Sequence, residues 1–312
     1  MLTRPEFLTY VEEHILEYVK DPEEKQASIR QVTKNNNISL NGLCIGKGEE
    51  VCQPIIYLDS YYEDYREGAD LGEILCRIGA VYEDSRADSP IDASLYRDYS
   101  HMRDLLFFRL VNYEKNKEQL KDCPCERIED LAVTYRWFAH HDKNGMASAL
   151  IRNQDLDLWG ITKDQLMKDA KANTKRVFPP LLRPMEELFP QMDAAGELFV
   201  LTNEEGLNGA GTVLYEGILD SFSDQIKGGF YILPSSIHEV LLVPEKEGSD
   251  PAALSELVKE VNRTVVDDGE ILSDRIYYYE KGQNVFMSKC EFYIRRDCDL
   301  VIRRTLLYNV NN

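Results

Sequence analysis

The sequence lacks the features of a secreted, membrane-spanning or metal-bound protein. It contains no apolar stretch near the roughly 20 residues that cross a bilayer, and its N-terminus has no basic region followed by an apolar run, so we expect no signal peptide. The seven cysteines are an odd number, and the closest pair, Cys123 and Cys125, fits neither a CxxC motif nor a four-ligand zinc pattern. We therefore expect a cytoplasmic protein with reduced thiols and no cofactor.

Basic residues are scarce relative to acidic ones. The chain has 36 Lys and Arg against 55 Asp and Glu, which gives a formal net charge of −19. Such a field repels nucleic acid backbones and anionic lipid, so we expect neither as a partner. Two interpretations of the charge stay open: an ordinary acidic surface, or a mimic of DNA that occupies a DNA-binding protein as a decoy. The composition does not predict an oligomeric state.

The remaining composition is typical of a soluble globular protein. Apolar residues make up 43% of the 312 residues and charged residues 29%. This length suits one large domain or two ordinary ones. Eighteen tyrosines against two tryptophans suit half-buried surfaces, because a phenol can bury its ring while its hydroxyl stays hydrated.

Helices and strands alternate in the first part of the chain. Thr3 is placed to cap a helix whose apolar residues recur at helical spacing from Phe7 to Val19. Residues 27–46 predict two strands joined at Asn35–Asn37, and residues 53–65 a strand that runs into a helical turn. A helix over 71–81 and a strand over 105–111 follow. The charged segment that ends at Pro124 indicates a boundary, so residues 1–124 form a predicted N-terminal α+β subdomain.

The second part is more regular. Residues 131–153 predict a hairpin with its turn at 143–145, and residues 163–178 a helix capped by Thr162, with Gln165 at the capping-box position. Further strands and helices alternate to residue 286, among them a helix predicted within residues 212–226 from the spacing of Val213, Ile218, Leu219 and Phe222. Residues 125–288 thus form a predicted C-terminal α+β subdomain with one sheet covered by helices, and residues 289–312 a tail or edge strand. The fold class we expect is α+β, with mixed or antiparallel sheets in two subdomains.

The segment YILPSSIHEVLLVP (231–244) raises the question of a serine nucleophile. Ser235 or Ser236 with His238 would suit a serine hydrolase, which needs a base within reach of the hydroxyl and a third group to orient it. There is no Gly-x-Ser-x-Gly elbow. In a strand, residues two positions apart point to the same face but are displaced along the chain, so the side chains of Ser236 and His238 would not point at each other. The favoured interpretation is structural: Ser236 and Glu239 form a capping box that starts one helical turn between two strands.

Two other segments suggest ligand sites. His140, His141 and Asp142, with His101 elsewhere, are metal-ligand types, but adjacent residues of a strand point in opposite directions, and a solvated hairpin end is favoured. Residues 204–212 (EEGLNGAGT) lie between a strand and a helix, where glycine-rich loops can cradle phosphate. The spacing matches no phosphate motif and the loop has no lysine, so a flexible turn is favoured.

Several motifs together resemble a known family. VTYRWF, LWGITKDQLMKDAKANT, LFVLTN, YILPSSIHEVLLVP and LSDRIYYY are similar to an uncharacterised bacterial family, the DUF5688 type, up to about Phe286. From about Leu131 the order of elements is also similar to the uncharacterised DUF1444 type. The resemblance implies no activity and no catalytic residues, because neither family brings any.

The sequence therefore favours a non-catalytic cytosolic accessory or protein-binding protein. No set of His, Cys, Asp and Glu stands at ligand spacing, and no nucleophile has an evident base, so we lean against an enzyme. The alternatives are a serine hydrolase that uses Ser235 or Ser236 with His238, and the acidic decoy. The partner we expect is another protein.

Overall fold

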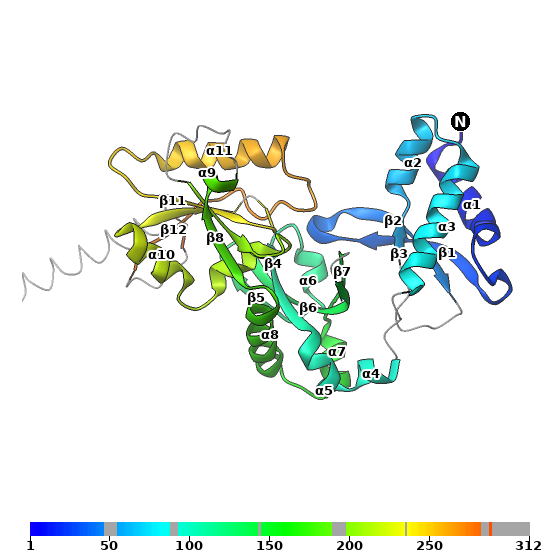
Figure 1. The fold of residues 1–312 in the computed structure, drawn as a ribbon, viewed down its shortest axis with the longest axis horizontal. Coiled ribbons are helices and arrows are strands. Elements are labelled where there is room, and N and C mark those ends of the chain that lie inside the picture. Colours follow the sequence, from blue (N-terminus) through cyan, green and yellow to red (C-terminus); the bar gives the residue numbers. More distant parts are fainter. Residues whose placement is uncertain are drawn as a thin grey trace, which may run out of the picture. The chain divides into compact units, whose positions relative to one another are not determined.

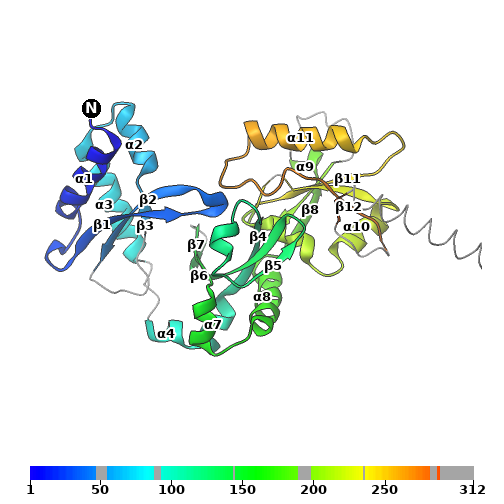
Figure 2. The same ribbon diagram turned by 180° about the vertical axis from the view of Figure 1, so that it is seen from behind.

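The computed structural model describes residues 1–46, 55–87, 93–142, 145–188, 198–234, 236–281 and 287–288. Its described part falls into two compact units that interleave along the chain (Figures 1 and 2). Unit 1 comprises residues 1–105, 137–149 and 154–161, and unit 2 comprises residues 106–136, 150–153 and 162–312. The predicted division into subdomains at residues 1–124 and 125–288 stays a prediction. The predicted tail, 289–312, lies outside the described residues.

Unit 1 begins with a helix laid on a small antiparallel sheet. The strands β1 (Gln26–Thr33), β2 (Ser39–Gly46) and β3 (Ile55–Tyr57) pair in the order β1-β2-β3, with the 3₁₀ turn η3 (Asn35–Asn37) between the first two. Asn36 and Asn37 have positive φ, as the predicted asparagine turn requires. The helices around this sheet are α1 (Arg4–His14), η1 (Ile15–Tyr18), η2 (Pro22–Glu24), α2 (Asp59–Arg66) and α3 (Leu71–Ala87).

One apolar core joins these helices to the sheet. Phe7 and Val11 of α1 are buried, so the first part of the predicted apolar face is confirmed. Ile15 and Val19 are buried too, but the α-helix ends at His14, with Ile15 in η1 and Val19 in extended chain. These four residues pack with Leu58, which precedes α2, and with residues of β2, β3 and α3, namely Leu43, Ile45, Ile56, Ile74, Leu75 and Ile78. Thr3 begins α1 as predicted: its main-chain N–H donates to the Glu6 carboxylate at 2.7 Å.

The rest of unit 1 is made of short helices and two strands. These are α4 (Ala93–Arg97), α5 (Tyr99–Met102), η4 (Arg103–Leu105), the part of β6 (Leu131–Asp142) from Trp137 onward, β7 (Gly145–Leu150) and α7 (Asn153–Trp159). Both tryptophans lie here: the rings of Trp137 and Trp159 pack on Tyr96 with centroids 5.4 Å and 5.7 Å away. The Trp159 N–H donates to the Tyr96 carbonyl at 2.7 Å.

Unit 2 is built on a six-stranded antiparallel sheet. Its strand order is β13-β12-β10-β11-β9-β8. The strands are β8 (Pro180–Pro184), β9 (Phe199–Asn203), β10 (Phe230–Leu233), β11 (Val240–Pro244), β12 (Tyr277–Tyr279) and β13 (Met287–Ser288). Short helical segments α9 (Met185–Leu188) and η5 (Gly209–Leu214) connect them.

A helix covers each face of this sheet. On one face, Leu254 and Val258 of α11 (Pro251–Thr264) pack on residues of β10, β11 and β12. On the other face, the ring of Phe222 in α10 (Ile218–Ile226) packs against the ring of Phe230, with the ring centroids 4.8 Å apart. The two helices lie on opposite sides of the sheet in both views (Figures 1 and 2), so alternate residues of β10 are buried by different helices.

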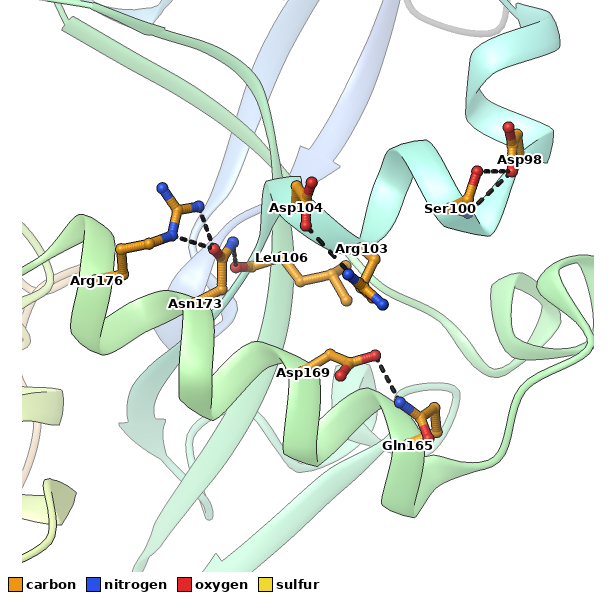
Figure 3. A network of polar contacts seen from close by, with 9 residues as sticks. All are labelled: Asp98, Ser100, Arg103, Asp104, Leu106, Gln165, Asp169, Asn173 and Arg176. Atoms are coloured by element: carbon orange, nitrogen blue, oxygen red, sulfur yellow. Dashed lines mark hydrogen bonds and ion pairs between the residues drawn. The ribbon is translucent and has the colours of Figure 1, made fainter.

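A second, four-stranded sheet contains β4 (Leu106–Asn112), β5 (Cys125–Ile128) and β6 (Leu131–Asp142), in the order β4-β6-β5, with β7 paired to β6. The short helix α6 (Lys117–Leu120) precedes β5. The helix α8 (Lys163–Val177) is tied to β4, because the Asn173 amide donates to the Leu106 carbonyl at 2.7 Å (Figure 3) and Thr174 accepts from the Phe108 N–H at 2.9 Å. Asn173 in turn accepts from the Arg176 guanidinium.

The α+β class and the antiparallel sheets are confirmed, but two details differ from prediction. The C-terminal part does not form one sheet, because the hairpin of β6 and β7 joins β4 instead of the later strands. The helix expected from Val213 begins only at Ile218, because Gly217 takes a left-handed conformation (φ 80°) that separates it from η5.

Candidate functional site

The serine–histidine segment is a crossing between β10 and β11. Pro234 follows β10, and Ser236 forms an isolated antiparallel bridge with Ile271. The Ser236 Oγ accepts a hydrogen bond from the main-chain N–H of His238 at 2.9 Å. The predicted helical turn is therefore wrong: Ser236 forms a serine turn with His238, the chain bends at 237 and 238, and the bridge to Ile271 holds the backbone. Ser235 lies outside the described residues.

Both nitrogens of the His238 ring are engaged. The main-chain N–H of Asn208 donates to Nδ1 at 3.3 Å, and Nε2 lies 3.2 Å from Oε1 of Glu270. Because Nδ1 accepts, this geometry assigns the proton of the neutral ring to Nε2, which donates to Glu270. Neither nitrogen is then free to take a proton from a serine hydroxyl. The ring joins two loops instead.

The glycine-rich segment packs directly under the crossing. Its residues from Gly209 to Val213 are buried in η5 rather than forming the flexible turn predicted. A Cβ on Gly209 would lie 2.5 Å from the His238 carbonyl oxygen and 2.8 Å from the Asn203 nitrogen. Only glycine permits so close an approach of three backbone segments, so the glycine serves packing rather than phosphate binding.

Further main-chain bonds tie the crossing to its surroundings. The Thr202 hydroxyl donates to the His238 carbonyl at 2.8 Å, and the Ala210 N–H donates to the Ile237 carbonyl at 3.2 Å. On the other side, the Ile237 N–H donates to the Glu270 carbonyl at 2.9 Å. The polar groups of the crossing are thus used in holding three segments of unit 2 together.

Two carboxyl groups lie beside His238. Burial raises the pKa of Glu239, and the charge of Glu270 raises it further, while His238 and a hydrogen bond from Ser236 act in the opposite direction. Glu270 is 44% exposed. A carboxylate next to His238 is what a hydrolase would need, but here Glu270 holds Nε2 while Asn208 occupies Nδ1, so His238 is not placed to act as the base for Ser236.

The predicted metal ligands are not brought into one site. His140 and Asp142 lie on β6, and their side chains are outside the described part of the structure. The His141 ring is half-buried and stacks on Phe138 with centroids 4.7 Å apart, while His101 is exposed on α5. Over the described ranges, no group of three or more His, Cys, Asp or Glu residues is placed to hold a metal ion.

Unit 2 contains a buried carboxylate that the sequence did not predict. Asp130 accepts hydrogen bonds from the hydroxyls of Ser273 (2.7 Å) and Tyr277 (2.6 Å). Burial and the charge of Asp130 raise the pKa of Tyr277, so this phenol stays protonated as a donor. Nothing local signals the cluster, because Asp130 and Ser273 are 143 residues apart.

Arg109 also escaped the sequence analysis, although it had a visible signal. It is the one charged residue in the apolar strand β4, LFFRLVN. Its Nε is buried and has no hydrogen-bond partner. A charged residue in the middle of a buried strand needs a partner, so the pattern alone could have singled it out.

No helix in the described ranges is both long and apolar enough to span a bilayer. No curated protein and no solved structure matches the chain. The resemblance of the C-terminal half to the DUF1444 type stays a prediction. The model of the family of unknown function DUF5688 matches residues 4–281, so the chain belongs to this family.

Proposed function

We propose that the protein is a non-catalytic cytosolic accessory protein that binds another protein through the open edge of strand β1. The observation that carries the proposal is the state of this edge in unit 1. β1 lies at the end of its sheet, and none of its eight residues is buried. An exposed strand edge is a template to which an extended segment of another chain can add.

The direction of the main-chain groups of β1 follows from two hydrogen bonds. The main-chain N–H of Lys34 donates to the Ile38 carbonyl across the hairpin. Because paired residues of antiparallel strands alternate between bonded and non-bonded pairs, the main-chain groups of the even-numbered residues of β1 bond to β2 in this register. Consistently, the Ile29 N–H points away from β2 and donates to the Glu12 carboxylate at 2.9 Å. Gln31 therefore faces outward too, and no hydrogen bond to its outward groups is found within the described part of the chain.

The same carboxylate indicates what the partner segment contains. A strand added to β1 would cover Glu12, and a buried carboxylate requires a cationic or hydrogen-bonding partner. The net charge of −19 also favours a basic partner. We therefore expect an extended segment with Lys or Arg opposite Glu12.

A proline at residue 31 tests the proposal. Gln31→Pro removes an outward N–H without removing a bond to β2, so the fold should be kept while strand addition is blocked. Tagged wild-type protein and both variants, Gln31→Pro and the control Gln31→Ala, would be recovered from cells, and bound proteins quantified by mass spectrometry. We expect a basic partner to be lost at least tenfold with Gln31→Pro alone. Equal recovery with all three proteins would contradict the proposal.

One observation keeps the hydrolase as a second candidate: the carboxylate of Glu270 beside His238. A hydrolase would require the ring to exchange its bond with Asn208 for one with a serine. Hydrolysis of model esters, compared between wild type and Ser236→Ala, tests this directly. Equal rates in both proteins would exclude Ser236 as a nucleophile.

A further inference from the structure

The tail, residues 289–312, contains a six-residue pattern that occurs twice. Residues 291–296 read EFYIRR and residues 299–304 read DLVIRR, so an acidic residue, three apolar residues and two arginines recur after eight positions. The apolar positions hold aromatic, β-branched and leucine side chains, most of which favour extended chain. The tail carries five Lys and Arg against three Asp and Glu, in a chain whose net charge is −19. Each pattern therefore has the composition of a short basic strand.

An extended chain would give each pattern one face with a fixed order of side chains. Alternate residues of a strand point to the same side, so Phe292, Ile294 and Arg296 would share a face. In the second pattern the corresponding residues are Leu300, Ile302 and Arg304. Either strand would thus offer two apolar side chains followed by a cation.

The edge of β1 presents groups that complement this face. Ala27 and Ile29 are partly buried and pack against the core that the helices of unit 1 form with the sheet. The Glu12 carboxylate lies at the same edge, because its Oε1 accepts from the Ile29 N–H at 2.9 Å. Glu12 is exposed, and within the ranges that the structure describes no hydrogen bond reaches its second oxygen. The edge thus combines apolar surface with a carboxylate that can accept a further bond.

We infer that residues 291–304 of a second copy of the chain occupy the β1 edge, which rests on the role proposed above for that edge. One six-residue pattern is long enough to pair along most of β1, which has eight residues. The added strand would bond to outward-facing main-chain groups such as those of Gln31, and an arginine would pair with Glu12. Self-association and the binding of another protein are then alternatives at one edge.

The symmetry of this contact follows from the two surfaces that it joins. The edge of one copy meets the tail of another, so the contact is head to tail, and a dimer keeps one unused edge and one unused tail. Wild-type protein should therefore form larger species as its concentration rises. Gel filtration with light scattering measures the molar mass of these species.

Two variants of the full chain each remove one side of the contact. Gln31→Pro blocks the edge and keeps the tail, and Gln31→Ala is its matched control. The second variant keeps the edge and reverses the charge of the tail, with the four changes Arg295→Glu, Arg296→Glu, Arg303→Glu and Arg304→Glu. We expect either variant to weaken self-association by about tenfold or more, because strand addition is lost in one and Glu12 repels the tail in the other.

An equimolar mixture of the two variants separates a contact between copies from a contact within one chain. One variant supplies the intact tail and the other the intact edge, so the mixture should form a dimer although neither variant associates alone. A tail bound to its own chain would not restore association in this way. The counterpart with lysine at the same four positions keeps the charge and should associate in the absence of any mixing partner.

A wild-type protein that stays monomeric as its concentration rises, or a mixture that does not dimerise, would overturn the inference. The proposed function would survive that outcome if Gln31→Pro still loses a basic partner recovered from cells. Equal melting temperatures of Gln31→Pro and Gln31→Ala would show that the edge variant keeps its fold, and the tail variant tests the contact without any change in β1.

Discussion

The crossing around His238 and the strand around Arg109 both belong to unit 2, but they differ in whether their polar side chains have hydrogen-bond partners. At the crossing, each nitrogen of the histidine has a partner, and the neighbouring serine is bonded to the backbone. At Arg109, a buried guanidinium nitrogen has none. The residues that look reactive in the sequence are thus occupied in holding the fold, while a residue inside an apolar run keeps a buried nitrogen without a hydrogen-bond partner. The two regions are therefore distinguished by whether their polar groups have hydrogen-bond partners, and not by the types of residue that they contain.

Among the changes that test this comparison, Gly209→Ala is expected to have the largest effect on the free energy of unfolding. The added methyl group would meet the His238 carbonyl and the Asn203 nitrogen, which are backbone atoms and cannot move aside easily. Overpacking of this kind costs about 1–3 kcal/mol of unfolding free energy, measurable by urea denaturation. Gly228→Ala is the control, because no atom lies within 4 Å of the position that its added methyl group would take. Equal stability of the two variants would show that the crossing is loosely packed.

The sequence predicts what is determined locally. The cap of α8 at Thr162, whose hydroxyl accepts from the Gln165 N–H at 3.2 Å, depends on residues three positions apart and is confirmed. The helical turn at Ser236 was predicted by the same kind of motif and is wrong, because the bridge to Ile271 and the bond from the Ile237 N–H to the Glu270 carbonyl fix that backbone from elsewhere. The cluster of Asp130 with Ser273 and Tyr277 depends on which distant segments become neighbours in the fold, which no local pattern specifies.

A smaller effect is expected from Ser236→Ala. This change removes the acceptor for the His238 N–H and should lower the unfolding free energy by about 0.5–2 kcal/mol. Chemical denaturation measures it, and Ser221→Ala on α10 is a control at an exposed serine. A loss of some catalytic activity in Ser236→Ala without any loss of stability would instead support the hydrolase.

The smallest effect concerns Glu239 and depends on pH. Its pKa is raised in the folded state, so the folded protein binds this proton more strongly than the unfolded chain does. The stability contributed by this proton is present at pH values below the unfolded pKa and is lost as the pH rises through the folded pKa. Glu239→Gln should therefore gain stability relative to the wild type across that window.

Melting curves from pH 4 upward, recorded for both proteins, measure the difference. Glu247→Gln, at an exposed carboxylate, is the matched control and should follow the wild type. A constant difference between Glu239→Gln and the wild type over the whole range would show that Glu239 does not titrate as its burial implies.

The bond between Asp130 and Ser273 has a consequence for biosynthesis. Strands β4, β5 and the first half of β6 belong to unit 2, yet the hydroxyls that satisfy Asp130 lie near the end of the described chain. While the ribosome is still translating the segments between them, the carboxylate must stay hydrated, and that sheet cannot close around it. Nascent chains that stop before Tyr277 should thus expose these strands to chaperones, and unit 2 should acquire its final form only late in translation.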